Sequence, residues 1–185
     1  MKTDASLVAV RRADLPGPDS AIVSRLVRAY LVQTEAEKAV NLSDYEGGCG
    51  DGDGGVRTEL PTRYRAEVED PERAYAGATV LLAELNGSPA GVMVVQHGAD
   101  AHEIKRVWVN PSARGRHVGS ALLDAALREG DRPVRLTVWK WRGSAIQLYR
   151  TRGFAIVPSW EERPGLVCME LRDPAAERVE AWPDA

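Results

Sequence analysis

The chain has 185 residues, of which 44% are hydrophobic and 28% charged, a composition that suits one globular domain able to bury a core and shape a pocket. Its formal net charge of −3 argues against nonspecific nucleic-acid binding, which needs a basic surface. The N-terminal segment lacks a long apolar region and no stretch approaches about 18 consecutive apolar residues, so we expect neither secretion nor a membrane span and predict a cytoplasmic protein.

The N-terminal part is predicted to contain a strand and two helices. Residues 6–12 alternate enough to form a strand, which the segment Leu15-Pro16-Gly17-Pro18 ends. Asp19 or Ser20 is then placed to cap a helix with one apolar face. A second helix is predicted from Glu35 to Asp44. The apolar face of the first helix consists of Ile22, Val23, Leu26, Val27 and Tyr30.

Residues 46–55, EGGCGDGDGG, are predicted to form a mobile loop, because ordering so many glycines costs much backbone entropy. Asp51-x-Asp53-Gly is similar to the start of an EF-hand loop, but the later glycine and glutamate do not fall at the required positions, so calcium binding is not expected. A further short helix is predicted from Leu60 to Glu69, where Asp70-Pro71 closes it.

Three successive antiparallel strands are predicted next. The apolar runs 78–85 and 90–96 are joined by Asn86-Gly87-Ser88-Pro89, which is a strong hairpin signal. After a turn at residues 97–100, a third strand is predicted from Glu103 to Val109, where Asn110-Pro111 ends it.

The C-terminal part alternates strands with a helix. Strands are predicted at residues 134–139 and 166–171. Ser144 is predicted to begin a helix through a capping box with Gln147, and Gly153 stands where a left-handed residue ends a helix. From Asp173 the chain reads as a frayed tail, so we expect one domain over residues 1–172 and a tail over 173–185. Cys49 and Cys168 lack a Cys-x-x-Cys pair, which indicates free thiols and no metal site.

A basic turn joins the third strand to an amphipathic helix. The turn contains Arg114, Gly115, Arg116, His117, Val118, Gly119 and Ser120, and its two arginines add positive charge. A helix that begins there directs free N–H groups and the positive end of its dipole at the space in front, which indicates a phosphate or pyrophosphate site. A Rossmann turn or a Walker loop would need glycine patterns that are absent. The apolar face of the helix is Val118, Ala121, Leu122, Ala125 and Ala126.

At these residues the chain resembles the GNAT superfamily of acyl-CoA-dependent N-acyltransferases. The family pattern is Gln/Arg-x-x-Gly-x-Gly/Ala after a strand that ends in Val-x-Pro, and here Val109-Asn110-Pro111 precedes Arg114-x-x-His117-x-Gly119. His117 therefore stands at the first glycine position. The resemblance implies a single α/β (α+β) domain with a mixed, mostly antiparallel sheet flanked by helices. It also implies that the pantetheine arm of acetyl-CoA lies along backbone groups of Val107, Trp108 and Val109.

A second motif of the family, Asn-x-x-Ala-x-x-x-Tyr-x-x-x-Gly-Phe, falls in register at Ala145, Tyr149, Gly153 and Phe154. Arg142 replaces the asparagine, which usually contacts the cofactor in the family, and its side chain is long enough to reach a phosphate. By the resemblance Tyr149 would protonate the departing CoA thiolate; the alternative is a core tyrosine that packs with Leu148 and Phe154.

The reaction that the resemblance implies is direct attack of a neutral amine on the thioester of acetyl-CoA. Because an alkylamine has a pKa of about 10, a base or a water relay must remove a proton. Glu103 matches the strand position of a catalytic glutamate in some family members; the alternative is a strand-edge surface glutamate that pairs with Lys105 or another basic residue. Trp108 is interpreted either as a core residue or as part of the acceptor pocket, Trp139 as core and Trp141 as a pocket wall.

The predicted function is therefore acetyl-CoA-dependent acetylation of a primary amine on a small molecule. The segment from Glu35 to Glu59 contains seven acidic residues and only two basic ones, and this negative charge indicates a cationic acceptor. The alternative is that the acidic segment only keeps the protein soluble. Acetylation of protein N-termini or lysines and non-catalytic acyl-CoA binding also stay open, as does a homodimer. His97 and His102 are interpreted as turn or surface residues.

Overall fold

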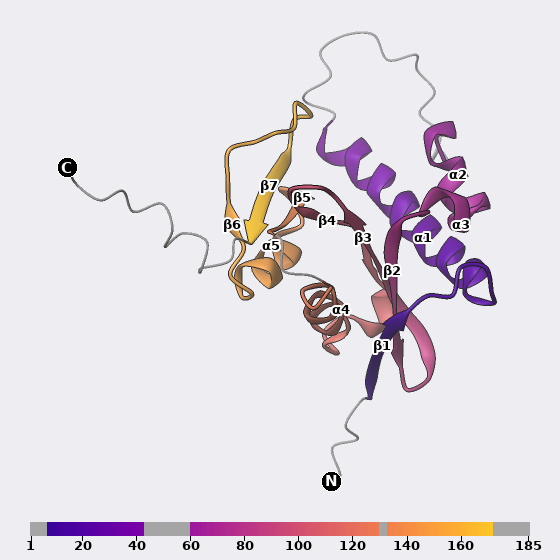
Figure 1. Ribbon diagram of the computed structural model, residues 1–185. Helices are drawn as coiled ribbons and strands as arrows, with labels where there is room; N and C mark the ends of the chain where they lie inside the picture. The colour runs from indigo at the N-terminus through magenta and orange to yellow at the C-terminus, as the bar shows by residue number, and fades with distance from the viewer. Residues whose placement is uncertain (1–6, 43–59, 130–132, 172–185) are drawn as a thin grey trace.

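The computed structural model describes residues 7–42, 60–129 and 133–171, which form a seven-stranded sheet flanked by helices (Figure 1). The strand order is β1-β2-β3-β4-β5-β7-β6, and every neighbouring pair is antiparallel except β4 and β5. The predicted α/β domain with a mixed, mostly antiparallel sheet is thus confirmed. The strands are β1 (Val8–Arg12), β2 (Ala78–Leu85), β3 (Ser88–His97), β4 (His102–Val109), β5 (Val134–Trp139), β6 (Ala155–Ile156) and β7 (Leu166–Leu171). The helices are α1 (Asp19–Asn41), α2 (Arg65–Glu69), α3 (Pro71–Ala74), α4 (Val118–Ala126) and α5 (Gly143–Arg150), with 3₁₀ turns at Thr62–Tyr64 and Pro111–Ala113.

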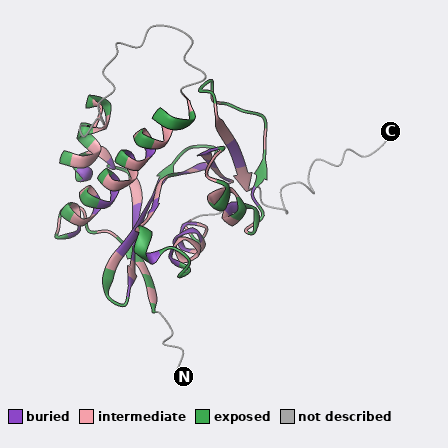
Figure 2. Ribbon diagram, turned by 180° about the vertical axis from the view of Figure 1, so that it is seen from behind, coloured by how far each residue is buried: buried purple, intermediate pink, exposed green. Residues whose placement is uncertain are grey.

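The sheet separates two apolar cores, and Figure 2 shows buried residues in purple along its strands. Helices α4 and α5 cover one face, where Leu122, Leu123 and Tyr149 pack on buried residues of β2 to β5 and β7. Helix α1 covers the other face through Leu26 and Leu31. Alternating side chains of a strand point to opposite faces, so β2, β3 and β4 contribute to both cores.

Strand β4 contains a bulge that separates it from β5. Two of its residues, Arg106 and Val107, face only Met93 of β3, and Arg106 has a positive φ of 52°. Because an extra residue bends the bulged strand, β4 pairs with β5 only from His102 to Ile104, while β5 continues to Trp139. The two parallel strands therefore diverge beyond the bulge.

The prediction of two separate helices before residue 45 was wrong, because α1 is a single helix there. It runs unbroken for 23 residues, because nothing between Tyr30 and Glu35 interrupts helical geometry. Asp19 is the first helical residue, and its side chain does not cap the helix. Instead its carboxylate accepts hydrogen bonds from the Arg11 guanidinium at 2.5 and 2.9 Å and from the Asp14 N–H at 2.8 Å, which fixes the start of α1 to the end of β1.

Asp70-Pro71 closes a helix as predicted, because α2 ends at Glu69 with Asp70 as its C-cap. The same two residues also begin α3, where the Asp70 side chain caps the helix and Pro71 occupies its first turn. Helix α5 begins at Gly143, with Arg142 as its N-cap and no side-chain cap, so Ser144 forms no capping box. Gly153 does adopt the predicted left-handed conformation, with φ of 89°.

Several predictions lie outside the described residues, namely the loop at 46–55, Cys49 and the tail from 173. Cys168 is a buried free thiol of β7. Among the described residues no group of three or more His, Cys, Asp or Glu side chains is placed to hold a metal ion. Of the helices described, none combines the length and apolar character that crossing a bilayer requires.

Candidate active site

The start of α4 presents unpaired backbone donors to a cavity. His117, the N-cap residue, has a left-handed backbone with φ of 63°, the conformation that a glycine would adopt without strain. The first intrahelical hydrogen bond runs from the Ala121 N–H to the His117 carbonyl, so the N–H groups of Val118, Gly119 and Ser120 have no partner inside the helix. Such a helix start favours an anion.

These N–H groups line a cavity of about 620 Å³, which we call the donor cavity after the acyl donor predicted for this turn. It lies between the start of α4, the diverging end of β4, helix α5 and the exposed side of α1. Of the predicted cofactor-binding residues only Arg116 is absent from its lining. Those that line it are Val107, Trp108, Val109, Arg114, Gly115, His117, Val118, Gly119, Ser120 and Arg142.

Two arginines of the donor cavity are held by α1. The Arg114 guanidinium donates to the Gln33 side chain at 3.1 Å and to the Val109 carbonyl at 3.2 Å. Arg142 donates to Glu37 at 2.8 Å and to the Thr34 hydroxyl at 2.7 Å. Burial alone would raise the pKa of Glu37, but hydrogen bonds from Gln33 and Arg142 lower it below its ordinary value. Side chains of α1 therefore hold both arginines in place through hydrogen bonds.

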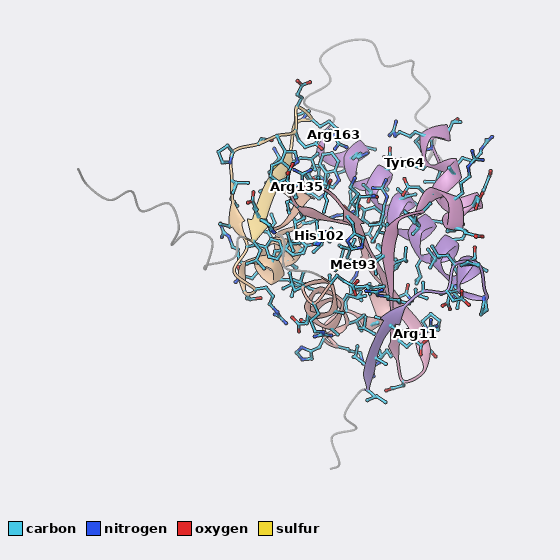
Figure 3. All side chains as sticks on the ribbon, viewed as in Figure 1. Arg11, Tyr64, Met93, His102, Arg135 and Arg163 are labelled. Carbon is cyan, nitrogen blue, oxygen red and sulfur yellow. The ribbon has the colours of Figure 1, made fainter. Side chains whose placement is uncertain are left out.

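A second cavity, of about 270 Å³, lies between the bulged part of β4, the end of β5 and α1, and we call it the acceptor cavity. Tyr30, Tyr64 and Trp139 supply aromatic surface to it, and Glu103 lies in its wall. Figure 3 shows Tyr64 and Arg163 at the same end of the sheet, and both line this cavity. The two cavities share four lining residues, which mark the place where they meet: Val107, Arg142, Ala145 and Tyr149.

Tyr149 is 4% exposed and packs against Phe154 with ring centroids 5.8 Å apart. Its ring belongs to the core, which was one of the two interpretations from the sequence, and the residue also lines both cavities. Its role as a proton donor stays a prediction. Burial raises the pKa of Tyr149 above its ordinary value. Among the described residues, none hydrogen-bonds to its hydroxyl, so the fold described leaves this group open to a ligand.

Glu103 lies in β4 just before the bulge, with its side chain 21% exposed. Lys105 approaches its carboxylate at 3.5 Å and Arg135 at 3.9 Å. The pairing with Lys105 that was considered from the sequence is present, and the carboxylate also faces the acceptor cavity. Glu103 is therefore paired with Lys105 and at the same time lines the acceptor cavity.

The tryptophans and histidines differ in part from expectation. Trp108 packs in the core under α1 and donates its indole N–H to Asn110. Trp139 is buried, as predicted, and also lines the acceptor cavity. Trp141 is not among the lining residues of either cavity; it stacks on the Trp139 ring with centroids 4.8 Å apart and donates its indole N–H to Glu37. His102 is buried rather than exposed, because it lies in β4 with its Nδ1 at 3.2 Å from that of His97.

Sequence reasoning missed the contribution of α1 and of the bulge. Tyr30, Thr34 and Lys38 line the acceptor cavity and recur every four residues, but the predicted break before Glu35 concealed this face. Arg106 also lines that cavity, and its guanidinium binds Glu67 at 2.5 and 2.6 Å. The sequence carries no signal that a positive φ falls at an arginine within a strand.

Comparison with known proteins gives a consistent result. The profile of the acetyltransferase (GNAT) family matches residues 53–154, more than half of the chain. An uncharacterised N-acetyltransferase of Methanocaldococcus jannaschii is 30% identical over 91 residues, which span 42% of this chain and only 40% of that relative.

Solved structures share the fold. The PaiA N-acetyltransferase of Thermoplasma acidophilum, in complex with coenzyme A, is 14% identical over 90% of this chain and 99% of its own, with a TM-score of 0.63. YncA of Salmonella typhimurium, with its cofactor acetyl-CoA, is 21% identical over 96% and 98% of the two chains, with a TM-score of 0.53. A GNAT-family acetyltransferase of Streptococcus pneumoniae is 22% identical over 90% and 99%, with a TM-score of 0.57.

Proposed function

Because the chain belongs to the GNAT family of acetyltransferases, we propose that it transfers the acetyl group of acetyl-CoA to a primary amine of a small molecule. The observation that carries this proposal is the meeting of two cavities at Tyr149 and Arg142. One cavity has the anion-binding start of a helix and the other has a carboxylate in its wall. A thioester and an amine that enter from opposite sides would react where the cavities join.

In this proposal the donor cavity holds acetyl-CoA. The free N–H groups of Val118, Gly119 and Ser120 bind the pyrophosphate. The pantetheine arm lies along the edge of β4 from Val107 to Val109, where divergence from β5 leaves backbone groups unpaired with that strand. Arg114, already held over the cavity by Gln33, adds positive charge.

The acceptor amine loses its proton to Glu103 directly or through a water relay, and its nitrogen then attacks the thioester carbonyl carbon. A C–N bond forms, and the C–S bond breaks as the tetrahedral intermediate collapses. Tyr149 hydrogen-bonds to the departing thiolate and donates its proton to it. The nitrogen, which became cationic on attack, loses its second proton through water to the tyrosinate, and Glu103 returns the first proton to solvent. No covalent enzyme intermediate forms, so both substrates must be bound together.

The expected preference for a cationic acceptor has limited support among the described residues. It rests on the acidic residues between Glu35 and Glu59, of which only Glu35 and Glu37 are described. Both already have basic partners, since Lys38 lies 2.6 Å from Glu35 and Arg142 lies 2.8 Å from Glu37. A cationic acceptor, the cytoplasmic location and the homodimer stay predictions. The acceptor cavity, at about 270 Å³, is smaller than pockets for drug-sized ligands and suits a small molecule or a single amino-acid side chain.

The test is turnover of acetyl-CoA with a panel of amines, with products identified by mass spectrometry. We expect acetylation of at least one class of small amine. Glu103→Gln should lower kcat/KM and steepen its dependence on pH, since the amine must then lose its proton to water. Tight binding of acetyl-CoA without turnover of any amine or peptide would instead favour the non-catalytic alternative.

A further inference from the structure

Most of the charged side chains that line the acceptor cavity are basic. Among its described lining residues the carboxylates are Glu103 and Glu161, each of which has a basic partner within 4 Å. The basic ones are Lys38, Lys105, Arg106, Arg142 and Arg163. Three carboxylates that pair with this group, Glu35, Glu37 and Glu67, are not part of the lining. The positive ends of these pairs are therefore closer to a bound molecule than the negative ends.

The aromatic rings of the cavity are likewise occupied by cations. Lys38 lies over the ring of Trp139 at 5.3 Å from its centroid, and Trp141 also stacks on that ring. The Tyr30 ring is approached by Arg142 at 5.2 Å and by Arg106 at 5.8 Å. An alkylammonium group commonly binds over aromatic rings, but here those positions are already taken. The cavity is consequently unsuited to a molecule whose only charge is positive.

Three guanidinium groups of the acceptor cavity have N–H donors that no described residue accepts from. Arg106, Arg142 and Arg163 form their hydrogen bonds to described residues through Nε and Nη2. No described residue accepts a hydrogen bond from the Nη1 atoms of these groups, so the fold described leaves these donors open to a ligand. Guanidinium donors bind carboxylates with charge-assisted hydrogen bonds, which are stronger than neutral ones.

We propose that the acceptor is a small primary amine that also carries a carboxylate, as an amino acid does, and that the basic side chains of the acceptor cavity bind this carboxylate. The inference rests on the proposed function and narrows it. Among cationic acceptors, a basic amino acid therefore fits the cavity and a polyamine does not. With the carboxylate held, the amine is oriented toward Glu103 and the junction of the two cavities.

Matched pairs of amines test this inference. Tyrosine is compared with tyramine and lysine with cadaverine, so that each pair differs by one carboxylate. We expect kcat/KM to be at least roughly tenfold higher for the carboxylated member, as one charge-assisted hydrogen bond would provide. The preference should shrink as salt is added. Equal rates, or faster acetylation of the decarboxylated members, would overturn the inference.

A pair of variants locates the effect. The Arg163 side chain is 59% exposed, so Arg163→Gln should fold normally; the variant removes one cavity cation and frees the Glu161 carboxylate. The KM of the carboxylated acceptor should rise roughly fivefold to tenfold, while that of tyramine or cadaverine stays or falls. Arg65→Gln is the control, because Arg65 is 65% exposed and pairs with Glu69 outside the cavity. If both variants change the selectivity equally, the assignment to this cavity is wrong.

A binding measurement separates this inference from the proposed reaction. N-acetyltyrosine and N-acetyltyramine are titrated calorimetrically into the protein saturated with CoA. If no amine is acetylated but N-acetyltyrosine binds more tightly, the reaction is refuted and the ligand class is supported. If no amine is acetylated and the two bind equally, both proposals fail.

Discussion

Replacing Tyr149 by phenylalanine separates its proposed chemical role from its structural role. The ring packs against Phe154 and the residue is 4% exposed, but no described residue hydrogen-bonds to its hydroxyl. Phenylalanine keeps the ring and its packing. We therefore expect the free energy of unfolding to change by less than about 0.5 kcal/mol, because no buried partner loses a hydrogen bond.

The catalytic effect should be much larger. Burial raises the pKa of Tyr149, so the hydroxyl stays protonated at neutral pH but is a weak acid. Its main contribution is then a hydrogen bond to the developing thiolate in a buried site, worth about 1.5–3 kcal/mol. Loss of that bond corresponds to a decrease in kcat of roughly 10²-fold, with little change in acetyl-CoA affinity.

The assay is steady-state turnover with the best acceptor, accompanied by calorimetry with acetyl-CoA and by urea unfolding. Tyr75→Phe is the matched control, since the Tyr75 hydroxyl donates to Glu67 at 2.9 Å within the fold. We expect it to lose about 1 kcal/mol of stability and to keep its kcat within about twofold. The proposed role of Tyr149 is refuted if its phenylalanine variant keeps full kcat when chemistry limits the rate.

Three further predictions concern the donor cavity and the fold. Gly119→Glu should abolish CoA binding in calorimetry by bulk and like charge, and circular dichroism should show an intact fold, since a Cβ there meets its nearest neighbour, Leu148, at an ordinary 3.4 Å. Unchanged affinity would mean that the pyrophosphate binds elsewhere. His117→Gly should raise the free energy of unfolding by about 0.5–1 kcal/mol, because φ of 63° strains any residue but glycine; a loss of stability in urea would show that imidazole contacts outweigh the strain. A hydrogen bond from Arg11 lowers the pKa of Asp19, so its stabilisation is present above the ordinary aspartate pKa of about 3.9 and lost as pH falls through the lower folded-state pKa. Asp19→Asn should thus be less stable than the parent at pH 7 and converge with it in acid, and a difference that persists in acid would contradict this.

The sequence by itself determined the parts of the protein that depend on local patterns. The hairpin at Asn86-Gly87, the central strands and the helix that starts at Val118 were all predicted from periodicity and turn residues, because these act within a few positions along the chain. The same is true of the family motifs, whose residues Arg114, Gly119 and Tyr149 lie within short segments.

Only the tertiary structure decided which charges meet at the site. Arg142 and Glu37 are 105 positions apart in the sequence, yet they form an ion pair, and Arg142 lines both cavities. The bulge at Arg106 depends on the register of β4 against β3, and it is this bulge that opens the sheet beside β5. The acidic N-terminal part indicated a cationic acceptor, whereas packing places its described carboxylates against basic partners. Such pairings depend on contacts distant in sequence, so no local pattern records them, and they set the charge that an acceptor encounters.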